Sequence, residues 1–246
     1  MTWVPKETPG EQYALAISLS VIATIFVGLR FYTRRVTKNA LMWDDWLVLI
    51  SLIGTYLTGI FIILGTALGN QGQHMKFTPE GFPITTPEYT WFLKMLYAGQ
   101  LSQIVAVGPT KIAVLLFYRR IFVGRVFEIV TWTLIFLVTA WSVGYFFANM
   151  LECIPISQSW ASAPGQGNPH CIDALPMYFS QVYSDVGLDC LIIIVPIPLV
   201  WSLQLPFKQK LAVTGIFLLG IITIAASCAK AVIFNLVGHA NPGCVL

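Results

Sequence analysis

Six long apolar runs, separated by short polar gaps, dominate this sequence. They lie near residues 13–33, 45–68, 89–118, 127–150, 177–203 and 211–238. Each run has about the 20 residues that an α-helix needs to cross the hydrocarbon core of a bilayer. A helix also satisfies its own backbone hydrogen bonds in lipid. The sequence therefore predicts an all-α fold, a polytopic transmembrane helix bundle with six spans.

The composition also indicates a membrane protein. The chain is 57% hydrophobic and only 10% charged, whereas a soluble domain has about 25% charged residues. The longest gaps, near 69–88 and 151–176, are too short to form a separate hydrophobic core. We therefore expect residues 1–246 to form a single transmembrane domain, in the plasma membrane or an endomembrane.

Basic residues concentrate in alternate gaps between the apolar runs. The basic residues in or beside the first, third and fifth gaps are Arg30, Arg34, Arg35, Lys38, Arg119, Arg120, Arg125, Lys208 and Lys210. Because basic residues stay on the cytosolic side, these gaps are predicted to face the cytosol and the N-terminus to lie outside. The basic gaps would then contact anionic membrane lipid. No feature of the sequence favours nucleic-acid binding.

Polar residues inside the apolar runs are the first candidates for a functional site, because charges in lipid are costly and usually face a bundle interior. Asp185 and Asp189 have the i, i+4 spacing that places both carboxylates on one helix face. Lys230 is predicted to lie at the depth of Asp185 on the next helix. With Gln100 and Gln103, these residues form a predicted outward-facing polar cavity for a small-molecule ligand. The alternatives are an interhelical salt bridge that only fixes packing and a proton or ion path.

A second group of candidates lies toward the predicted cytosolic face. Lys111 is in the inner half of the third run. Its long side chain is predicted either to extend toward the cytosol past Tyr118, Arg119 and Arg120 or to pair with an acidic residue such as Asp45. This face would be available to a cytosolic signalling partner.

Two adjacent carboxylates, Asp44 and Asp45, open the second apolar run. Carboxylates at a helix N-terminus accept hydrogen bonds from free amides and meet the positive end of the helix dipole. They are therefore predicted to cap this helix. The alternative is an ionic latch to Arg34, Arg35 or Arg120 that breaks on activation.

The fourth gap carries Cys153 and Cys171, and the charge pattern places this gap outside. An oxidising exterior permits a disulfide there. The three histidines, His74, His170 and His239, show no metal-ligand spacing. We expect neither a metal nor a soluble-enzyme active site.

Motifs in order along the chain resemble one known family. They are Arg30-Phe31 with Arg34, Asp44-Asp45-Trp46-Leu47, Gly72 to His74, Lys111 with Phe117-Tyr118-Arg119-Arg120-Ile121-Phe122, Cys153-Ile154-Pro155 with Trp160 and Cys171, Asp189 with Pro196-Ile197-Pro198, Lys210, and Phe217-Leu218-Leu219-Gly220. With these motifs the chain resembles the fungal rhodopsin-domain integral membrane proteins, which include receptor-like proteins of plant pathogens. The resemblance implies a rhodopsin-like helix arrangement and a Cys153–Cys171 pair.

The chain departs from this family at several positions. Ala113 replaces the usual serine, and Lys230 replaces the usual arginine. The family has seven helices, so the resemblance implies that a chain ending at Leu246 lacks the last helix and its glutamate, as a truncated seven-helix arrangement. Opsins attach retinal through a lysine in that helix, so we expect no cofactor.

Three functions remain open at this point. The resemblance favours an integral membrane receptor-like protein that senses an extracellular small molecule. One alternative is a non-signalling accessory membrane protein of a fungal secondary-metabolite pathway. Another is a membrane-embedded acid-catalysed enzyme such as a cyclase, with Asp185 or Asp189 as general acid. A cation at Lys230 argues against the enzyme, because it favours an ionised carboxylate.

Overall fold

The computed structural model describes residues 9–38, 40–69, 86–122, 124–160, 171–172, 174–197 and 220–229, together with positions 215, 218 and 232. The elements are α1 (Pro9–Val36), α2 (Trp43–Gly69), α3 (Pro87–Ile121), α4 (Arg125–Met150), the 3-10 helix η1 (Ile156–Trp160) and α5 (Ala174–Ile194). None of the described segments forms a strand, and the predicted all-α fold is confirmed.

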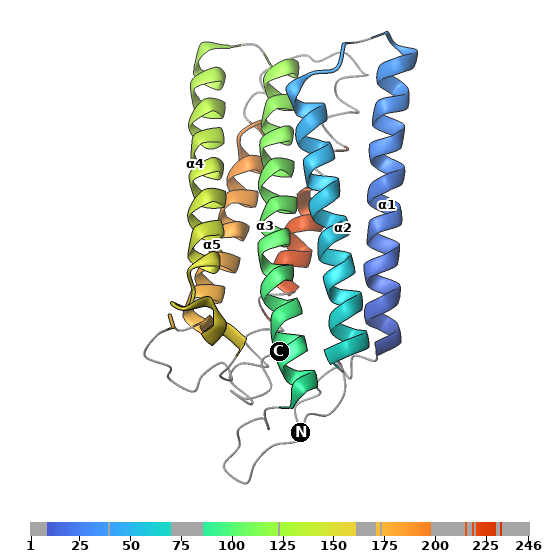
Figure 1. Ribbon diagram of the computed structural model, residues 1–246. Coiled ribbons are helices and arrows are strands. Elements are labelled where there is room, and N and C mark those ends of the chain that lie inside the picture. The colour runs from blue at the N-terminus through green and yellow to red at the C-terminus, as the bar shows by residue number, and fades with distance from the viewer. Residues whose placement is uncertain are drawn as a thin grey trace.

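The five α-helices run alternately up and down beside one another (Figure 1). Each is long and apolar enough to cross a membrane, which confirms the integral multi-pass prediction. The sixth apolar run is described mainly over Gly220–Ala229, a shorter apolar helix. Helix α3 is the central element, since 39% of its most apolar window is buried, compared with 6% for α1. Large apolar side chains on the outer faces are therefore available to lipid.

Small residues bring α2 against α3. A Cβ added at Gly54 would lie 2.6 Å from the backbone nitrogen of Ala106, which leaves no space for a side chain. Beside this contact, the Ser51 hydroxyl hydrogen-bonds with the Ala106 carbonyl and the Thr110 hydroxyl. Small and hydroxyl residues of this kind let transmembrane helices approach closely and hydrogen-bond across the interface. This interface fixes how α2 and α3 lie relative to each other.

The main apolar core fills the space between α3, α4 and α5 near one end of the bundle. Its buried members are Leu115, Tyr118, Phe122, Phe127, Leu134, Val138, Leu188 and Ile192. Tyr118 was expected at the cytosolic face, but its side chain is only 1% exposed and belongs to this core. The neighbouring Arg119 does reach the surface, where it pairs with Glu128 at 3.2 Å and lies over the Trp132 ring.

Helix α5 ends before the predicted end of the fifth span, of which residues 198–203 lie outside the described part of the chain. Helix α5 ends at Ile194, although the apolar run continues to about residue 203. Pro196 follows this end, and proline lacks the N–H that would continue the hydrogen-bond ladder. The run of apolar residues alone did not indicate this stop.

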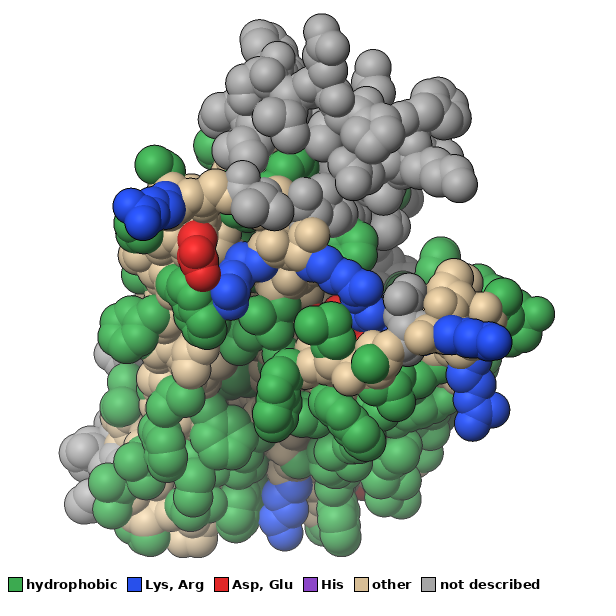
Figure 2. Space-filling view, turned by 90° about the horizontal axis from the view of Figure 1, so that it is seen from above, with side chains coloured by type: hydrophobic (Ala, Val, Ile, Leu, Met, Phe, Trp, Pro, Cys, Tyr) green, Lys and Arg blue, Asp and Glu red, His purple; other side chains and the backbone are tan. Residues whose placement is uncertain are grey.

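The α1–α2 and α3–α4 connections lie at the same end of the bundle, and the N-terminal end of α1 and the C-terminal end of α4 lie at the other (Figure 1). Basic side chains gather on the face seen in Figure 2, which views this first end. We predict that this end faces the cytosol. Tags inserted after residue 37, 122 or 208 should be protected in intact cells, while a tag ahead of residue 9 should be labelled. Labelling from outside at position 37 or 122 would contradict the orientation.

Candidate ligand cavity and its ion pairs

One lysine and two aspartates form an ion-pair cluster inside the bundle. The Lys111 ammonium lies 3.0 Å from Asp185 Oδ1 and 2.6 Å from Asp189 Oδ1. It also donates to the Asp185 backbone carbonyl at 3.0 Å. The lysine side chain is 6% exposed. Lys111 therefore does not extend toward the end of its helix, and the predicted pairing with an acidic residue is confirmed, with Asp185 and Asp189 as the partners in place of Asp45.

The cluster follows from the helix geometry on the α5 side. Asp185 and Asp189 stand four residues apart, so both carboxylates face α3, and one ammonium reaches both. Lys230, the expected partner of these aspartates, lies outside the described residues, and its approach to them remains a prediction. The sequence analysis did not pair Lys111 with these aspartates, because the spacing within one helix does not show which neighbouring helix faces it.

A cavity of about 140 Å³ adjoins this cluster. It is lined by Gln103, Ile104, Val107, Trp141, Tyr178, Gln181, Val182, Asp185 and Ser227. It thus lies between α3, α4, α5 and the helix at 220–229. Two of the predicted ligand-site residues, Gln103 and Asp185, are on its wall. A third, Gln100, hydrogen-bonds with the wall residue Tyr178.

Polar side chains of α4 and α5 position the cavity wall. The Trp141 indole donates to the Ser184 hydroxyl at 2.8 Å. The Asn149 amide donates to Gln181 Oε1 at 3.1 Å and to the Tyr145 carbonyl at 2.7 Å. None of these residues was predicted from the sequence as part of the site. The sequence did contain a signal for these residues, because amide and indole groups inside apolar runs need a hydrogen-bond partner.

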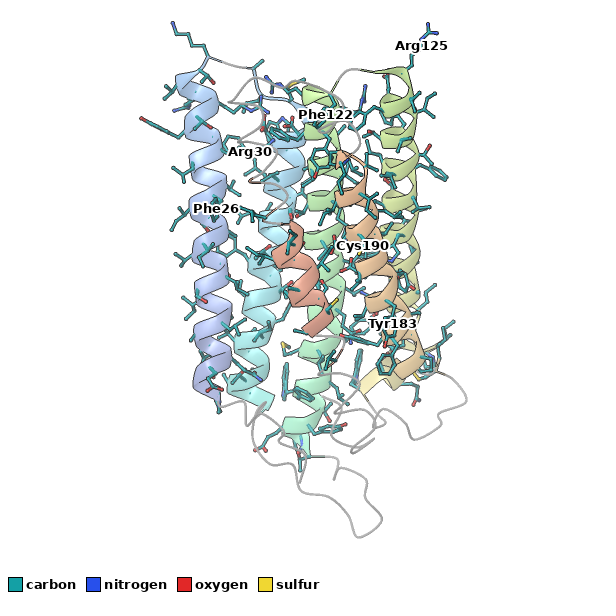
Figure 3. All side chains as sticks on the ribbon, turned by 180° about the vertical axis from the view of Figure 1, so that it is seen from behind. Phe26, Arg30, Phe122, Arg125, Tyr183 and Cys190 are labelled. Carbon is teal, nitrogen blue, oxygen red and sulfur yellow. A yellow bond between two sulfur atoms is a disulfide. The ribbon has the colours of Figure 1, made fainter. Side chains whose placement is uncertain are left out.

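At the other end of the bundle, two arginines of α1 bind the two carboxylates that open α2. Arg34 Nη2 lies 2.8 Å from Asp44 and 3.2 Å from Asp45, and Arg30 Nε lies 2.8 Å from Asp45. Asp45 Oδ2 also accepts from the Met42 backbone N–H at 3.0 Å, which caps the helix. Figure 3 shows Arg30 at the end of the bundle where Phe122 and Arg125 lie. Capping and ion pairing therefore occur together.

The arginines of this cluster differ in part from the expected set. Arg34 was predicted as a latch residue and does bind both carboxylates. Arg30 is the second partner, one helical turn before Arg34 on α1. Among the described ion pairs, neither Arg35 nor Arg120 contacts Asp44 or Asp45, so these two latch candidates are wrong.

A disulfide closes the segment that follows α4. Cys153 and Cys171 are bonded, with a sequence separation of 18. The backbone N–H of Ile172 donates to the Glu152 carbonyl at 2.8 Å. Burial raises the pKa of the Glu152 carboxyl. This end of α4 also contacts α3, because the Tyr97 hydroxyl donates to the Met150 carbonyl at 2.9 Å. The disulfide therefore tethers the connection between α4 and α5.

Removing this disulfide should destabilise the protein. Closing a loop of this length is worth about 3 kcal/mol in the chain-entropy model. The double variant C153S/C171S should unfold at a lower temperature in mild detergent, and reductant should lower the midpoint of the native protein similarly. Cys190→Ser is the control, because Cys190 is a free cysteine. An unchanged unfolding midpoint in C153S/C171S would contradict the expectation.

Comparison with known proteins gives a consistent set of relatives. A family model described as the fungal rhodopsin domain matches residues 29–242. The chain is 35% identical to the phomoidride biosynthesis cluster protein H of Fungal sp. (strain ATCC 74256), over 77% of this chain and 74% of that protein. It is 29% identical to the polyenoic acids biosynthesis gene cluster protein Ba17b of Metarhizium anisopliae, over 85% of this chain and 56% of the relative.

A SAT4 family membrane protein of Emericella nidulans is 29% identical, over 56% of this chain and 36% of that protein. The chain thus spans only about half, or less, of the length of two of these three relatives. No solved structure matches.

Proposed function

The chain belongs to the fungal rhodopsin domain family, and from this premise we propose that it is a receptor-like membrane protein that binds a small molecule in the cavity beside Asp185. Three of its relatives are named as biosynthesis cluster proteins for phomoidride, polyenoic acids and wortmanamides. A product or intermediate of such a secondary-metabolite pathway is the proposed ligand.

One observation carries this proposal: the cavity wall includes Asp185, which belongs to the Lys111 ion-pair cluster. A buried ion pair is weak evidence for stability, because desolvation offsets most of its Coulomb energy. Ionisable groups inside a membrane bundle therefore favour a functional role over simple packing. A ligand in this cavity would contact a group that also ties α3 to α5.

This connection suggests how binding would be sensed. Asp185 lies on α5, and its partner Lys111 lies on α3, about three turns before the inner end of that helix. A ligand that contacts Asp185 more favourably in one arrangement of α3 and α5 than in another would shift the population toward the first. The cytosolic ends of these helices would then present a changed surface to a signalling partner.

The ligand-binding step can be tested with the full chain in lipid nanodiscs. The protein is incubated with an organic extract of fungal culture, and the retained small molecules are identified by mass spectrometry. Val107→Trp should abolish retention, because the indole fills the cavity without changing its charge. Val143→Trp is the matched control, since Val143 is exposed on α4. Equal retention by both variants would place the ligand elsewhere.

A second candidate function is favoured by the names of the relatives. The chain would act as a non-signalling accessory membrane protein of a secondary-metabolite pathway. Deletion of the gene separates the two proposals. A receptor should alter transcription of target genes when the ligand is added, and this response should disappear on deletion. An accessory protein should change only the amount of the pathway product, with transcription unaffected.

A further inference from the structure

We propose that the cavity recognises an uncharged carbonyl group of its ligand through the side-chain amide N–H groups of Gln181. This inference rests on the proposed function, since it requires that the cavity hold a small molecule. It adds the chemical class of the ligand group that the cavity binds. The residues that carry it are Gln181 on the wall, Asn149 behind it, and Asp185 and Gln103 beside it.

The orientation of Gln181 follows from a chain of hydrogen bonds. A backbone carbonyl only accepts, so the atom of Asn149 that meets the Tyr145 carbonyl at 2.7 Å must be the Nδ2 donor. The same Nδ2 donates to Gln181 at 3.1 Å, so the Gln181 atom that it meets is the Oε1 acceptor. This assignment fixes both amides without reference to hydrogen positions. Asn149 is fully buried and acts as a positioning residue.

With its oxygen occupied, Gln181 is left with N–H donors for the cavity. Within the described part of the chain, its Nε2 makes no hydrogen bond to another residue. The side chain lines the cavity. A ligand oxygen that accepts a hydrogen bond therefore matches this wall, whereas a ligand donor does not. Gln103, also on the wall, offers a second amide with both a donor and an acceptor.

The charges around the cavity decide which acceptor fits. A carboxylate would also accept from Gln181, but it would lie beside the Asp185 carboxylate on the same wall. The Lys111 ammonium is already engaged by Asp185 and Asp189 at 3.0 and 2.6 Å. A second anion would therefore meet like-charge repulsion in a low-dielectric site. A ketone, ester or amide oxygen avoids this cost.

The size of the cavity sets how much of the ligand enters. A volume of about 140 Å³ is close to that of the engineered cavity of about 150 Å³ that binds benzene. The Trp141 and Tyr178 rings and Val107 supply apolar contacts around the amide groups. The cavity thus accommodates a ring or short chain that bears one carbonyl.

Small ring compounds of matched size test this reading on the full chain in nanodiscs. The probes are cyclohexanone, methylcyclohexane, cyclohexanecarboxylate and cyclohexylamine, followed by ligand-observed NMR, with the Val107→Trp protein as the background. Cyclohexanone should bind about fivefold more tightly than methylcyclohexane, as expected for one net hydrogen bond. Its carbonyl stretch should shift to lower frequency in the infrared spectrum on binding. Cyclohexanecarboxylate at neutral pH should bind more weakly than cyclohexanone.

Variants of Gln181 show whether its amide is responsible. Gln181→Met keeps the length of the side chain but removes the donors, so the fivefold preference and the infrared shift should disappear while methylcyclohexane binds as before. Gln181→Glu keeps an oxygen for Asn149 and places a second oxygen at the cavity. Its preference should reverse toward cyclohexylamine.

Each contrary outcome has a separate meaning. An unchanged preference for cyclohexanone in Gln181→Met would overturn carbonyl recognition by Gln181 but leave the cavity as a ligand site. Equal binding of cyclohexanecarboxylate and cyclohexanone would overturn the requirement for an uncharged group. Failure of every probe to bind the native protein above the Val107→Trp background would overturn both this inference and the proposed function.

Discussion

Replacing Lys111 by methionine is expected to lower the free energy of unfolding by about 3 kcal/mol, because it removes the cation that lies between two half-buried carboxylates. The Lys111 ammonium is the cation that contacts both Asp185 and Asp189 among the described residues. The side chain of Lys111 is 6% exposed, and those of Asp185 and Asp189 are 23% and 16% exposed, so solvent replaces only part of the lost interaction. Unfolding of the purified protein in mild detergent, followed by circular dichroism, measures the change.

Neutralising the carboxylates should recover much of this loss. The triple variant K111M/D185N/D189N should be less destabilised than the sum of its parts, because residues in one ion-pair network couple strongly. Glu128→Gln breaks the exposed Arg119–Glu128 pair and serves as the control, with an expected effect below about 1 kcal/mol. Strict additivity in the triple variant would show that the three groups do not interact.

Variants of Lys111 and Asp185 also distinguish a structural ion-pair cluster from a ligand site. A purely structural cluster would lose stability in Lys111→Met while ligand retention by the remaining folded protein stayed normal. A ligand site would lose retention in Asp185→Asn even under conditions where the fold is intact. A membrane-embedded acid would need to donate a proton, whereas Asp189 here accepts a hydrogen bond from the Lys111 ammonium. The enzyme reading therefore has the least support.

The sequence predicted the helices because hydrocarbon length determines them. Each apolar run needed about 20 residues to span a bilayer, and α1 to α5 lie within a few residues of the expected ranges. The end of α5 was the exception, because apolar residues continue past Ile194 while Pro196 lacks the N–H that an uninterrupted helix would use there. Hydropathy indicates how far the apolar run extends, whereas the position of Pro196 indicates where the helix is interrupted.

The partners of the polar residues were harder to predict, because they depend on how the helices are rotated and shifted against one another. The i, i+4 pair Asp185 and Asp189 indicated one polar face of a helix, but not which helix would meet it. The packing of α3 against α5 brings Lys111 within 3.0 Å of Asp185 and 2.6 Å of Asp189. A single apolar run does not show how its helix packs against another helix.

The partners of the amide side chains behind the cavity also depend on helix packing and were not predicted from the sequence. Asn149 and Gln181 lie in separate apolar runs, and only the packing of α4 against α5 brings them to 3.1 Å. The carboxylates at the start of α2 were easier, because helix capping is local in sequence. Their arginine partners came from the preceding helix, where Arg30 and Arg34 share a face at i, i+4 spacing. Local spacing therefore predicted more of that cluster than of the cavity.

A second large loss of stability is expected from Asp45→Asn, of about 3 kcal/mol. Asp45 is 1% exposed and pairs with Arg30 and Arg34, which would be left with a single carboxylate, Asp44. The asparagine oxygen can still accept from the Met42 N–H, so this variant isolates the charge. Asp45→Ala also removes the cap and should cost about 1 kcal/mol more.

The matched test uses the two adjacent arginines. Arg34→Met should destabilise the fold strongly, because the Arg34 side chain is 10% exposed and binds both carboxylates. Arg35→Met carries the same substitution one residue later on an exposed position of α1 and should change the unfolding midpoint little. Equal effects of the two variants would mean that general charge at this end of the bundle, rather than this cluster, stabilises the junction of α1 and α2. A midpoint lowered only by Arg34→Met and Asp45→Asn would establish the cluster as the clamp between these helices.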